Sequence, residues 1–255
     1  MTRTRLAGLR DGRPVRSVWT RLGWAGLALL LFAGFVGLGT WQLYRRAWKL
    51  DLIAAVQARA DAAPVPAPGP GRWDQASAAR DRYRHVRVSG HYLHGGETLV
   101  HGTSKLGYGY WVMTPLRTDR GFIVLVDRGH IPESLPGTPK FRSMLRPRGQ
   151  VTVTGLLRLS KVGGGVLRSN APDEGIWYSR DVDAIAAAAG LPVDWVAPYF
   201  IDADARPGRD GWPAGGLTVI RFPNHHLIYA ITWYAMALSV PISAFLVFRR
   251  GRAGA

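Results

Sequence analysis

The chain has 255 residues, with 33 Lys and Arg against 17 Asp and Glu, a net charge of +16 and no cysteine. The lack of cysteine excludes disulfides, thiolate zinc sites, iron–sulfur clusters and covalent c-type haem attachment. The positive charge does not indicate nucleic-acid binding, because no RNP, zinc-finger or helix-turn-helix pattern accompanies it.

Two uncharged apolar runs, at residues 22–44 and 227–248, predict transmembrane helices. A helix of about 20 apolar residues crosses the hydrocarbon core of a bilayer. The basic tails at residues 1–21 and 249–255 predict that both termini are cytoplasmic and that the segment between the spans is extracytoplasmic. We expect a multi-pass protein of a bacterial cell membrane, with the mitochondrial inner membrane as the alternative.

Residues 45–82 read as a helix that leaves the membrane, followed by an extended Pro-rich linker between Pro64 and Pro70. Residues 83–225 then show period-two alternation, which is typical of strands, and a Thr-Asp-Arg-Gly hairpin turn. A short helix is expected over Ser179–Gly190, with Ser179 or Asp181 as N-cap. The expected strands are Tyr83–Tyr92, Glu97–His101, Tyr110–Arg117, Phe122–Val126, Gln150–Leu159, Tyr199–Ala203 and Leu217–Arg221.

Together these elements predict an α+β membrane protein, in which two transmembrane α-helices flank an extracytoplasmic antiparallel β-barrel or sandwich with one minor helix. In the first span, Ala33 and Gly37 form a small-xxx-small pair that suits close helix contact. No pattern pairs a nucleophile with a base, so we expect no enzymatic activity.

Candidate binding residues gather where the second span begins. Asn224 reads as an N-cap that places His226 in the first helical turn, with Tyr229, Ala230 and Trp233 on the same helix face. That face could carry a flat apolar macrocycle below a nitrogen ligand, although a histidine that anchors at the lipid headgroups would give the same pattern. His225 is an adjacent alternative ligand.

Three arginines, Arg45, Arg46 and Arg221, are expected at the same membrane level, because the first span ends where the second begins. They could pair with the carboxylates of a bound amphiphile, or simply extend toward the interface as basic side chains commonly do. His85, His91, His94 and His101 form a His-rich stretch, for which a metal site is the less favoured interpretation.

Several strings, in this order along the chain, resemble the surfeit locus protein 1 family of cytochrome c oxidase assembly factors. They are LGTWQLYRRAWK at the first span exit, YRHVRVSGHYL, GYWVMTPLRT, VLVDRGHIP, NAPDEGIWYSRDVDAIAAAAGL and PNHHLIYAITWYAMAL at the start of the second span. Two positions depart from the family pattern. His130 replaces the usual Trp of Arg-Gly-Trp-x-Pro, as a further ligand or a smaller surface ring, and His225 precedes the family's histidine.

The resemblance implies an assembly factor for haem–copper cytochrome c oxidase that transiently holds or delivers haem a to subunit I, with haem a synthase as a further partner. It maps the family's proposed iron ligand to His226, and we expect Arg45, Arg46 and Arg221 to pair with the propionates. A scaffold that stabilises oxidase subunits without haem is the alternative, and a membrane-tethered hydrolase is a less favoured one. Oligomeric state and the oxidase served stay open.

Overall fold

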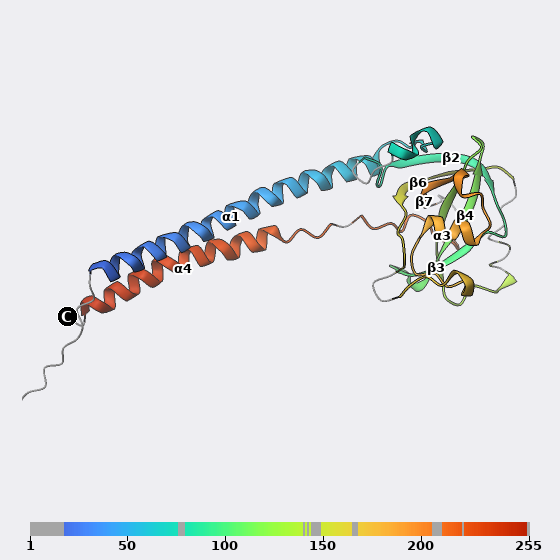
Figure 1. Ribbon diagram of the computed structural model, residues 1–255. Coiled ribbons are helices and arrows are strands. Elements are labelled where there is room, and N and C mark those ends of the chain that lie inside the picture. Colours follow the sequence, from blue (N-terminus) through green and yellow to red (C-terminus); the bar gives the residue numbers. More distant parts are fainter. Residues whose placement is uncertain are drawn as a thin grey trace, which may run out of the picture. The chain divides into compact units, whose positions relative to one another are not determined.

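The computed structural model describes residues 18–75, 80–139, 141, 143, 149–164, 168–205, 211–220 and 222–253, in two compact units (Figure 1). The helical unit comprises the described residues up to Leu52 and from Phe222 onward. The β unit comprises the described residues from Ile53 to residue 220.

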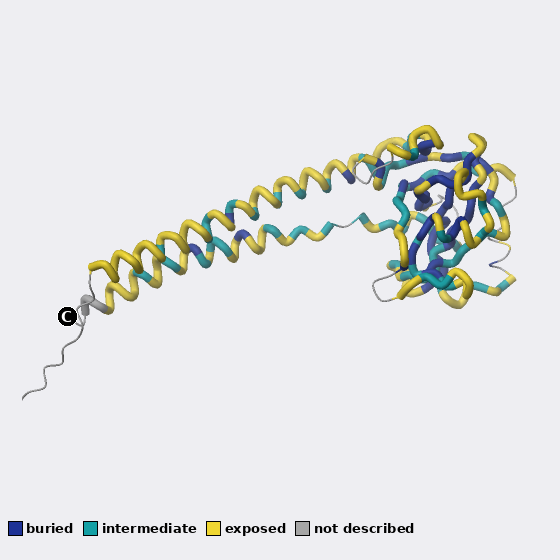
Figure 2. The backbone as a smooth tube through the Cα atoms, viewed as in Figure 1, coloured by how far each residue is buried: buried dark blue, intermediate teal, exposed yellow. Residues whose placement is uncertain are grey.

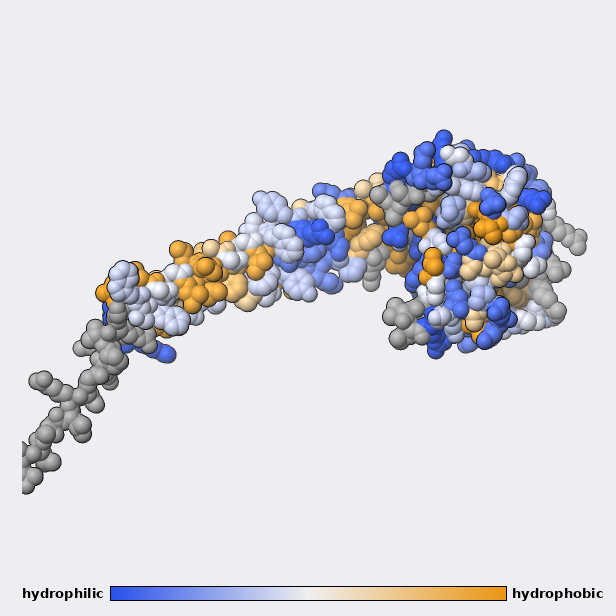
Figure 3. Space-filling model, viewed as in Figure 1, coloured by the Kyte–Doolittle hydropathy of each residue, from blue (hydrophilic) through white to orange (hydrophobic). Residues whose placement is uncertain are grey.

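The helical unit contains α4 (His226–Ala253) and most of α1 (Val18–Asp61). No proline or helix stop interrupts α1, so the expected span and the expected helix after it are one continuous helix of 44 residues. Both helices are long and apolar enough to cross a membrane, and only 6% of each most apolar window is buried. Their exposed apolar surface, visible in Figures 2 and 3, suits contact with lipid.

Within the helical unit, α1 and α4 lie side by side and meet through aromatic and small residues. The rings of Phe35 and Trp233 stack with centroids 5.9 Å apart, and the Thr40 and Tyr234 hydroxyls lie 3.0 Å apart. The close approach falls at Gly39, where a Cβ would come within 2.9 Å of the Tyr234 ring. Gly37 lies outside this contact, because a Cβ there would meet nothing within 4 Å, so the small pair at Ala33 and Gly37 does not contact α4 through Gly37, and its contact with a partner stays a prediction.

The β unit is a barrel in which β2, β6, β7, β5 and β4 pair in a closed ring, with β1 and β3 added outside it (Figure 1). Closure depends on Gly90 of β2, where a Cβ would collide with the Arg117 carbonyl oxygen of β4. The strands are β1 (Val65–Pro66), β2 (His85–Tyr92), β3 (Thr98–Ser104), β4 (Gly107–Thr118), β5 (Ile123–Pro132), β6 (Val151–Leu159) and β7 (Val196–Ala203).

The expected wholly antiparallel sheet is corrected by two parallel pairs, β1 with β2 and β5 with β7. Between β5 and β7 the chain forms β6 and then a connection that contains α3 (Val182–Ala188), whose N-cap is Asp181 as one of the two expectations had it. The expected late strand is wrong over the described residues 217–220, and its last residue, Arg221, lies outside the described residues.

The Pro-rich segment is not a solvated linker. It forms β1 and a 3-10 helix (Pro70–Gln75), and it buries Ala67, Pro68 and Gly69. The Tyr199 hydroxyl of β7 donates a hydrogen bond of 2.5 Å to the Pro68 carbonyl. Proline has no amide hydrogen to satisfy, which suits a short edge strand that pairs on one side only, as β1 does with β2.

Three apolar clusters build the described part of the β unit, the smallest of them formed by Val112, Ile131 and Phe141. The barrel interior contains Val86, Leu116, Val124, Leu157 and Ile201, all at or near zero exposure. A second core lies between the sheet and α3, where Ile185 packs with Leu125, Trp177 and Phe200. Burial is therefore concentrated in the strands of the β unit and is low along both long helices (Figure 2).

Candidate functional site at the start of helix α4

His226 is the first residue of α4, in the first helical turn as the sequence predicted. The Tyr229 amide donates a hydrogen bond of 3.3 Å to the His225 carbonyl, so His225 directly precedes the helix and accepts the bond of its first turn. The expected N-cap role of Asn224 is wrong, because its buried Oδ1 has no hydrogen-bond partner among the described residues. His225 itself is exposed.

The imidazole of His226 is held by α1. Its Nδ1 lies 2.7 Å from Oε1 of Gln42, which belongs to the Thr-Trp-Gln-Leu-Tyr string at the expected exit of the first span. An amide oxygen can only accept, so in the neutral imidazole Nδ1 carries the proton and Nε2 keeps its lone pair. This is the arrangement in which a histidine can ligate a metal through Nε2 while its other nitrogen is oriented by a neighbour.

Of the three residues expected on the face of α4 below His226, two are covered and one is exposed. Trp233 stacks on Phe35 of α1, and Ala230 is only 1% exposed on the same face. A flat ring could therefore contact Ala230 only after the two helices separate. Tyr229 is 56% exposed and lies open to a ligand or to lipid.

Two of the three expected arginines, Arg45 and Arg46, lie in the helical unit that contains His226. Arg45 is exposed, with its guanidinium carbon 4.1 Å from the centroid of the Trp48 ring. Arg46 is half-buried, one helical turn after Gln42 on the same face of α1. Arg221 lies outside the described residues. The structure thus brings Gln42, Arg46 and His226 into the same helical unit.

The His-rich stretch of the β unit serves hydrogen bonding and packing. His85 bonds to Asp204 Oδ2 and to the Ala62 carbonyl, each at 2.8 Å, and these partners raise its pKa although burial opposes the shift. His101 stacks on Tyr178 with centroids 5.1 Å apart. Among the described residues, no three His, Asp or Glu side chains are placed to hold a metal ion.

His130 is fully buried, so the expectation of a surface ring at this position is wrong. Its ring meets Trp111 edge-on at 5.2 Å, and its Nε2 lies 3.4 Å from the Gly102 carbonyl. Burial lowers the pKa of His130, because the cationic form would lose its hydration.

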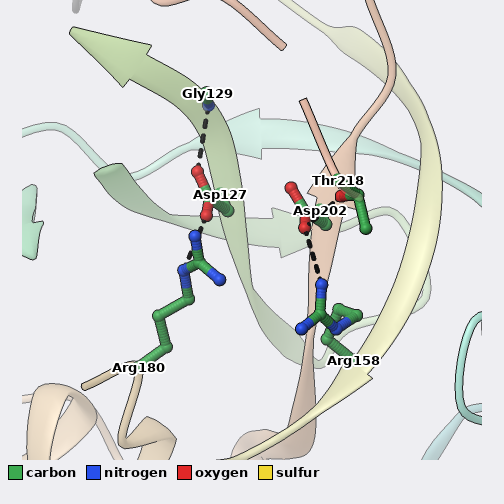
Figure 4. Close-up of polar contacts among 6 residues, drawn as sticks. All are labelled: Asp127, Gly129, Arg158, Arg180, Asp202 and Thr218. Atoms are coloured by element: carbon green, nitrogen blue, oxygen red, sulfur yellow. Dashed lines mark hydrogen bonds and ion pairs between the residues drawn. The ribbon is translucent and has the colours of Figure 1, made fainter. Parts of the chain in front are cut away.

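Sequence reasoning missed Gln42 and two buried carboxylates of the β unit. Asp127 and Asp202 lie on β5 and β7 and face Arg180 and Arg158 (Figure 4). Their signal was in the sequence, because Asp202 is the only charged residue of β7 and Asp127 directly follows the apolar run of β5, where an unpaired charge would be strongly disfavoured. The only sequence signal for Gln42 was that it is a polar residue near the end of an apolar span.

Comparisons with known proteins agree with the resemblance seen in the sequence. The SURF1 family model matches residues 29–238. Surfeit locus protein 1 of Rattus norvegicus is 34% identical over 238 residues, which covers 87% of this chain and 74% of the relative. The Homo sapiens protein of the same name is 34% identical over 89% of this chain and 78% of its own length. A SURF1-like protein of Monosiga brevicollis is 35% identical, with coverage of 86% and 84%.

Proposed function

Since this chain belongs to the SURF1 family, we propose that it is a non-catalytic assembly factor for haem–copper cytochrome c oxidase. In this proposal it transiently holds haem a, or delivers it to subunit I, with haem a synthase as the source. The assignment combines the family with the site at the start of α4.

The observation that carries the proposal is the pairing of His226 with Gln42 at 2.7 Å. It leaves Nε2 with a lone pair and fixes the ring orientation, which are the two conditions for an axial nitrogen ligand. The bound group would supply an iron with an axial position for this nitrogen. A single protein ligand suits temporary holding, because nothing else in this arrangement fixes the iron.

The remaining roles follow from exposure and charge. Arg45, exposed beside Trp48, and Arg46 are the proposed partners of the propionates, together with Arg221. Tyr229 is the proposed ring contact on the open side of α4. Trp233 and Ala230 would join it where α4 parts from α1, and His225 is the adjacent alternative ligand.

An apolar groove between α1 and α4 is the proposed site for the isoprenoid tail. It has a volume of about 580 Å³ and is lined by residues of α1 from Arg21 to Leu31 and of α4 from Ser239 to Phe248. At 1.5 Å per residue, Ser239 lies roughly 20 Å along α4 from His226. A tail extended along α4 from an iron at His226 would run toward this groove.

The proposal is tested by purifying the full chain after co-expression with haem a synthase and recording its absorption spectrum. The wild type and His225→Ala should carry a haem a Soret band, and His226→Ala should lose most of it. Equal bands in wild type and His226→Ala would refute His226 as the ligand. Loss in His225→Ala alone would move the ligand by one residue.

A scaffold without haem is the second candidate, and one observation favours it. The face of α4 that carries Ala230 and Trp233 is already covered by α1. A chain that only steadies oxidase subunits would need this packing and no ligand. The same absorption spectra decide between the two functions, because a scaffold predicts no haem a band in the wild type or in any variant. Under both functions, oxidase assembly should fail in cells that lack this chain.

A further inference from the structure

A cavity of about 280 Å³ lies in the β unit, apart from the helical site described above. This is the small end of the range for ligand pockets. Strands β3, β4, β6 and β7 and the segment before α3 all contribute to it. The lining residues are Val100, His101, Gly102, Thr103, Trp111, Arg158, Leu159, Lys161, Tyr178, Ser179, Arg180 and Phe200.

Flat aromatic rings form much of the wall. The guanidinium carbon of Arg180 lies 4.5 Å from the Trp111 ring centroid and 5.5 Å from that of Phe200. Tyr178 and His101 stack at 5.1 Å and present a second flat surface. Rings of this kind favour a planar ligand, because a planar group gains contact over its whole face.

Three cations and two carboxylates set the charge of the cavity. Arg180 Nε lies 2.8 Å from Asp127 Oδ2, and Arg158 donates to Asp202 Oδ2 at 3.2 Å (Figure 4). Both carboxylates are more deeply buried than their guanidinium partners, with side-chain exposures of 0% for Asp127 and 3% for Asp202. Lys161 adds a third positive charge at the exposed side. The three cations outnumber the two acids whether or not Asp127 is ionised, so the cluster carries a net positive charge that attracts an anion.

The segment that presents Arg180 is fixed in place before any ligand arrives. Asn170 Oδ1 accepts hydrogen bonds from the Tyr178 and Ser179 amides, at 2.8 and 3.1 Å. The Ser179 hydroxyl accepts from the Gly164 amide at 2.9 Å. The motif that begins at Asn170 in the sequence therefore builds a rigid wall of the cavity, and binding would cost little ordering entropy.

We propose that this cavity binds a carboxylate attached to a flat apolar group. A planar guanidinium pairs with a carboxylate through two parallel hydrogen bonds, and the aromatic walls accept the apolar part. The flat apolar walls favour such a ligand over inorganic phosphate, which has no apolar part to contact them. Two sources share this chemistry, an Asp or Glu side chain beside an aromatic residue in a partner polypeptide and a small free aromatic acid.

The first test compares 4-fluorobenzoate with its neutral counterpart 4-fluorobenzamide as ligands of the full chain in non-ionic detergent. Binding of each probe is measured by the broadening of its fluorine NMR line. The acid should bind saturably and at least about tenfold more tightly than the amide, because charge-assisted hydrogen bonds are roughly twice as strong as neutral ones. Equal affinity for the two probes would overturn the proposal.

Variants then locate the binding. Lys161→Gln is an exposed change, and Asp127→Asn with Arg180→Gln removes a buried pair together, so that neither charge is left alone. Both should weaken 4-fluorobenzoate binding several-fold, the pair more strongly. Arg87→Gln, an exposed charge on β2 away from the cavity, is the matched control and should bind as wild type does. Unchanged binding in both cavity variants would contradict the site.

Competition distinguishes the sources. If the blocked dipeptide acetyl-Phe-Asp-amide displaces the probe at lower concentration than benzoate does, and acetyl-Phe-Asn-amide does not, the ligand is a polypeptide carboxylate. If benzoate is the tighter competitor, the ligand is a small aromatic acid. Displacement by inorganic phosphate at the same concentration as benzoate would overturn the carboxylate assignment in favour of general anion attraction.

Discussion

At the residue scale, the chain orients polar groups by hydrogen bonds that join distant parts of the sequence. His226 and Gln42 are 184 positions apart and meet at 2.7 Å. The sequence could nominate His226, because a histidine at the start of an apolar span is conspicuous. It could not supply Gln42, because a hydrogen-bond partner depends on the rotation of two helices about their axes, which the apolar pattern leaves open.

Gln42 is predicted to act as a positioning residue for His226. Gln42→Glu keeps an acceptor and strengthens it, whereas Gln42→Leu removes it. A stronger acceptor makes the imidazole more basic, so the reduction potential of bound haem a should fall in Gln42→Glu and rise in Gln42→Leu. Redox titration of the purified pigment measures this. Identical potentials in both variants would show that Gln42 only packs the helices.

Asp127 predicts a pH dependence of stability in the β unit. Burial raises its pKa to about 7, with Asp202 adding to the rise, while Arg180, the Gly129 amide and Arg158 oppose it. Because the folded state holds this proton more tightly than the unfolded chain, the stabilisation is complete below the ordinary carboxyl pKa of about 4 and is lost as the pH rises through 7.

The measurement is urea unfolding of the full chain in detergent, followed by tryptophan fluorescence between pH 4 and 8. One proton sets an upper limit of about 1.4 kcal/mol per pH unit on the slope. Asp127→Asn should flatten the decline between pH 5 and 7 relative to wild type. A slope that persists unchanged in Asp127→Asn would assign the dependence to other groups.

At the scale of elements, periodicity located most strands to within a few residues, because alternation along β2 and β6 reflects one buried and one outer face. The order and direction of the strands in the sheet could not be predicted from the sequence pattern. The parallel pairing of β5 with β7 and the packing of the Pro-rich segment depend on long-range contacts that no local pattern encodes. The sequence also did not indicate that Gly39, and not Gly37, is the glycine that lies against α4.

The α1–α4 contact predicts a cross-linking result, for which the cysteine-free chain is well suited. Cysteines at Phe35 and Trp233, whose rings stack in the wild type, should join in high yield with a short bismaleimide. Adding Gly39→Leu should lower the yield several-fold, because a larger side chain collides with Tyr234.

A control pair at Leu29 and Leu238, both exposed, should cross-link poorly within one molecule with or without Gly39→Leu. Equal yields for the contact pair and the control pair would contradict the helix contact. Gel mobility of the monomer separates internal from intermolecular products.

At the scale of the whole molecule, basic residues determine how the chain should lie in a membrane. Arginine-rich tails flank two apolar helices, and the β unit lies between those helices in the sequence. By the preference of basic segments for the cytoplasmic side, both termini are predicted to lie inside and the β unit outside.

Single cysteines test this arrangement directly. In intact cells, a membrane-impermeant maleimide should label Lys105→Cys, on the exposed turn between β3 and β4, without permeabilisation. Arg250→Cys, near the end of α4, should react only after the cells are permeabilised. The reverse pattern would show the opposite orientation, and labelling of both in intact cells would argue against two spans.

Nε2 of His226 is predicted to ligate the iron of haem a, and rescue by exogenous imidazole provides a sharp test of this bond. His226→Gly, co-expressed with haem a synthase, should lose the Soret band and regain it when imidazole is added, since the free ring can occupy the vacated position. His225→Gly should keep its band throughout. A band that persists in His226→Gly without imidazole, or that imidazole fails to restore, would contradict the account.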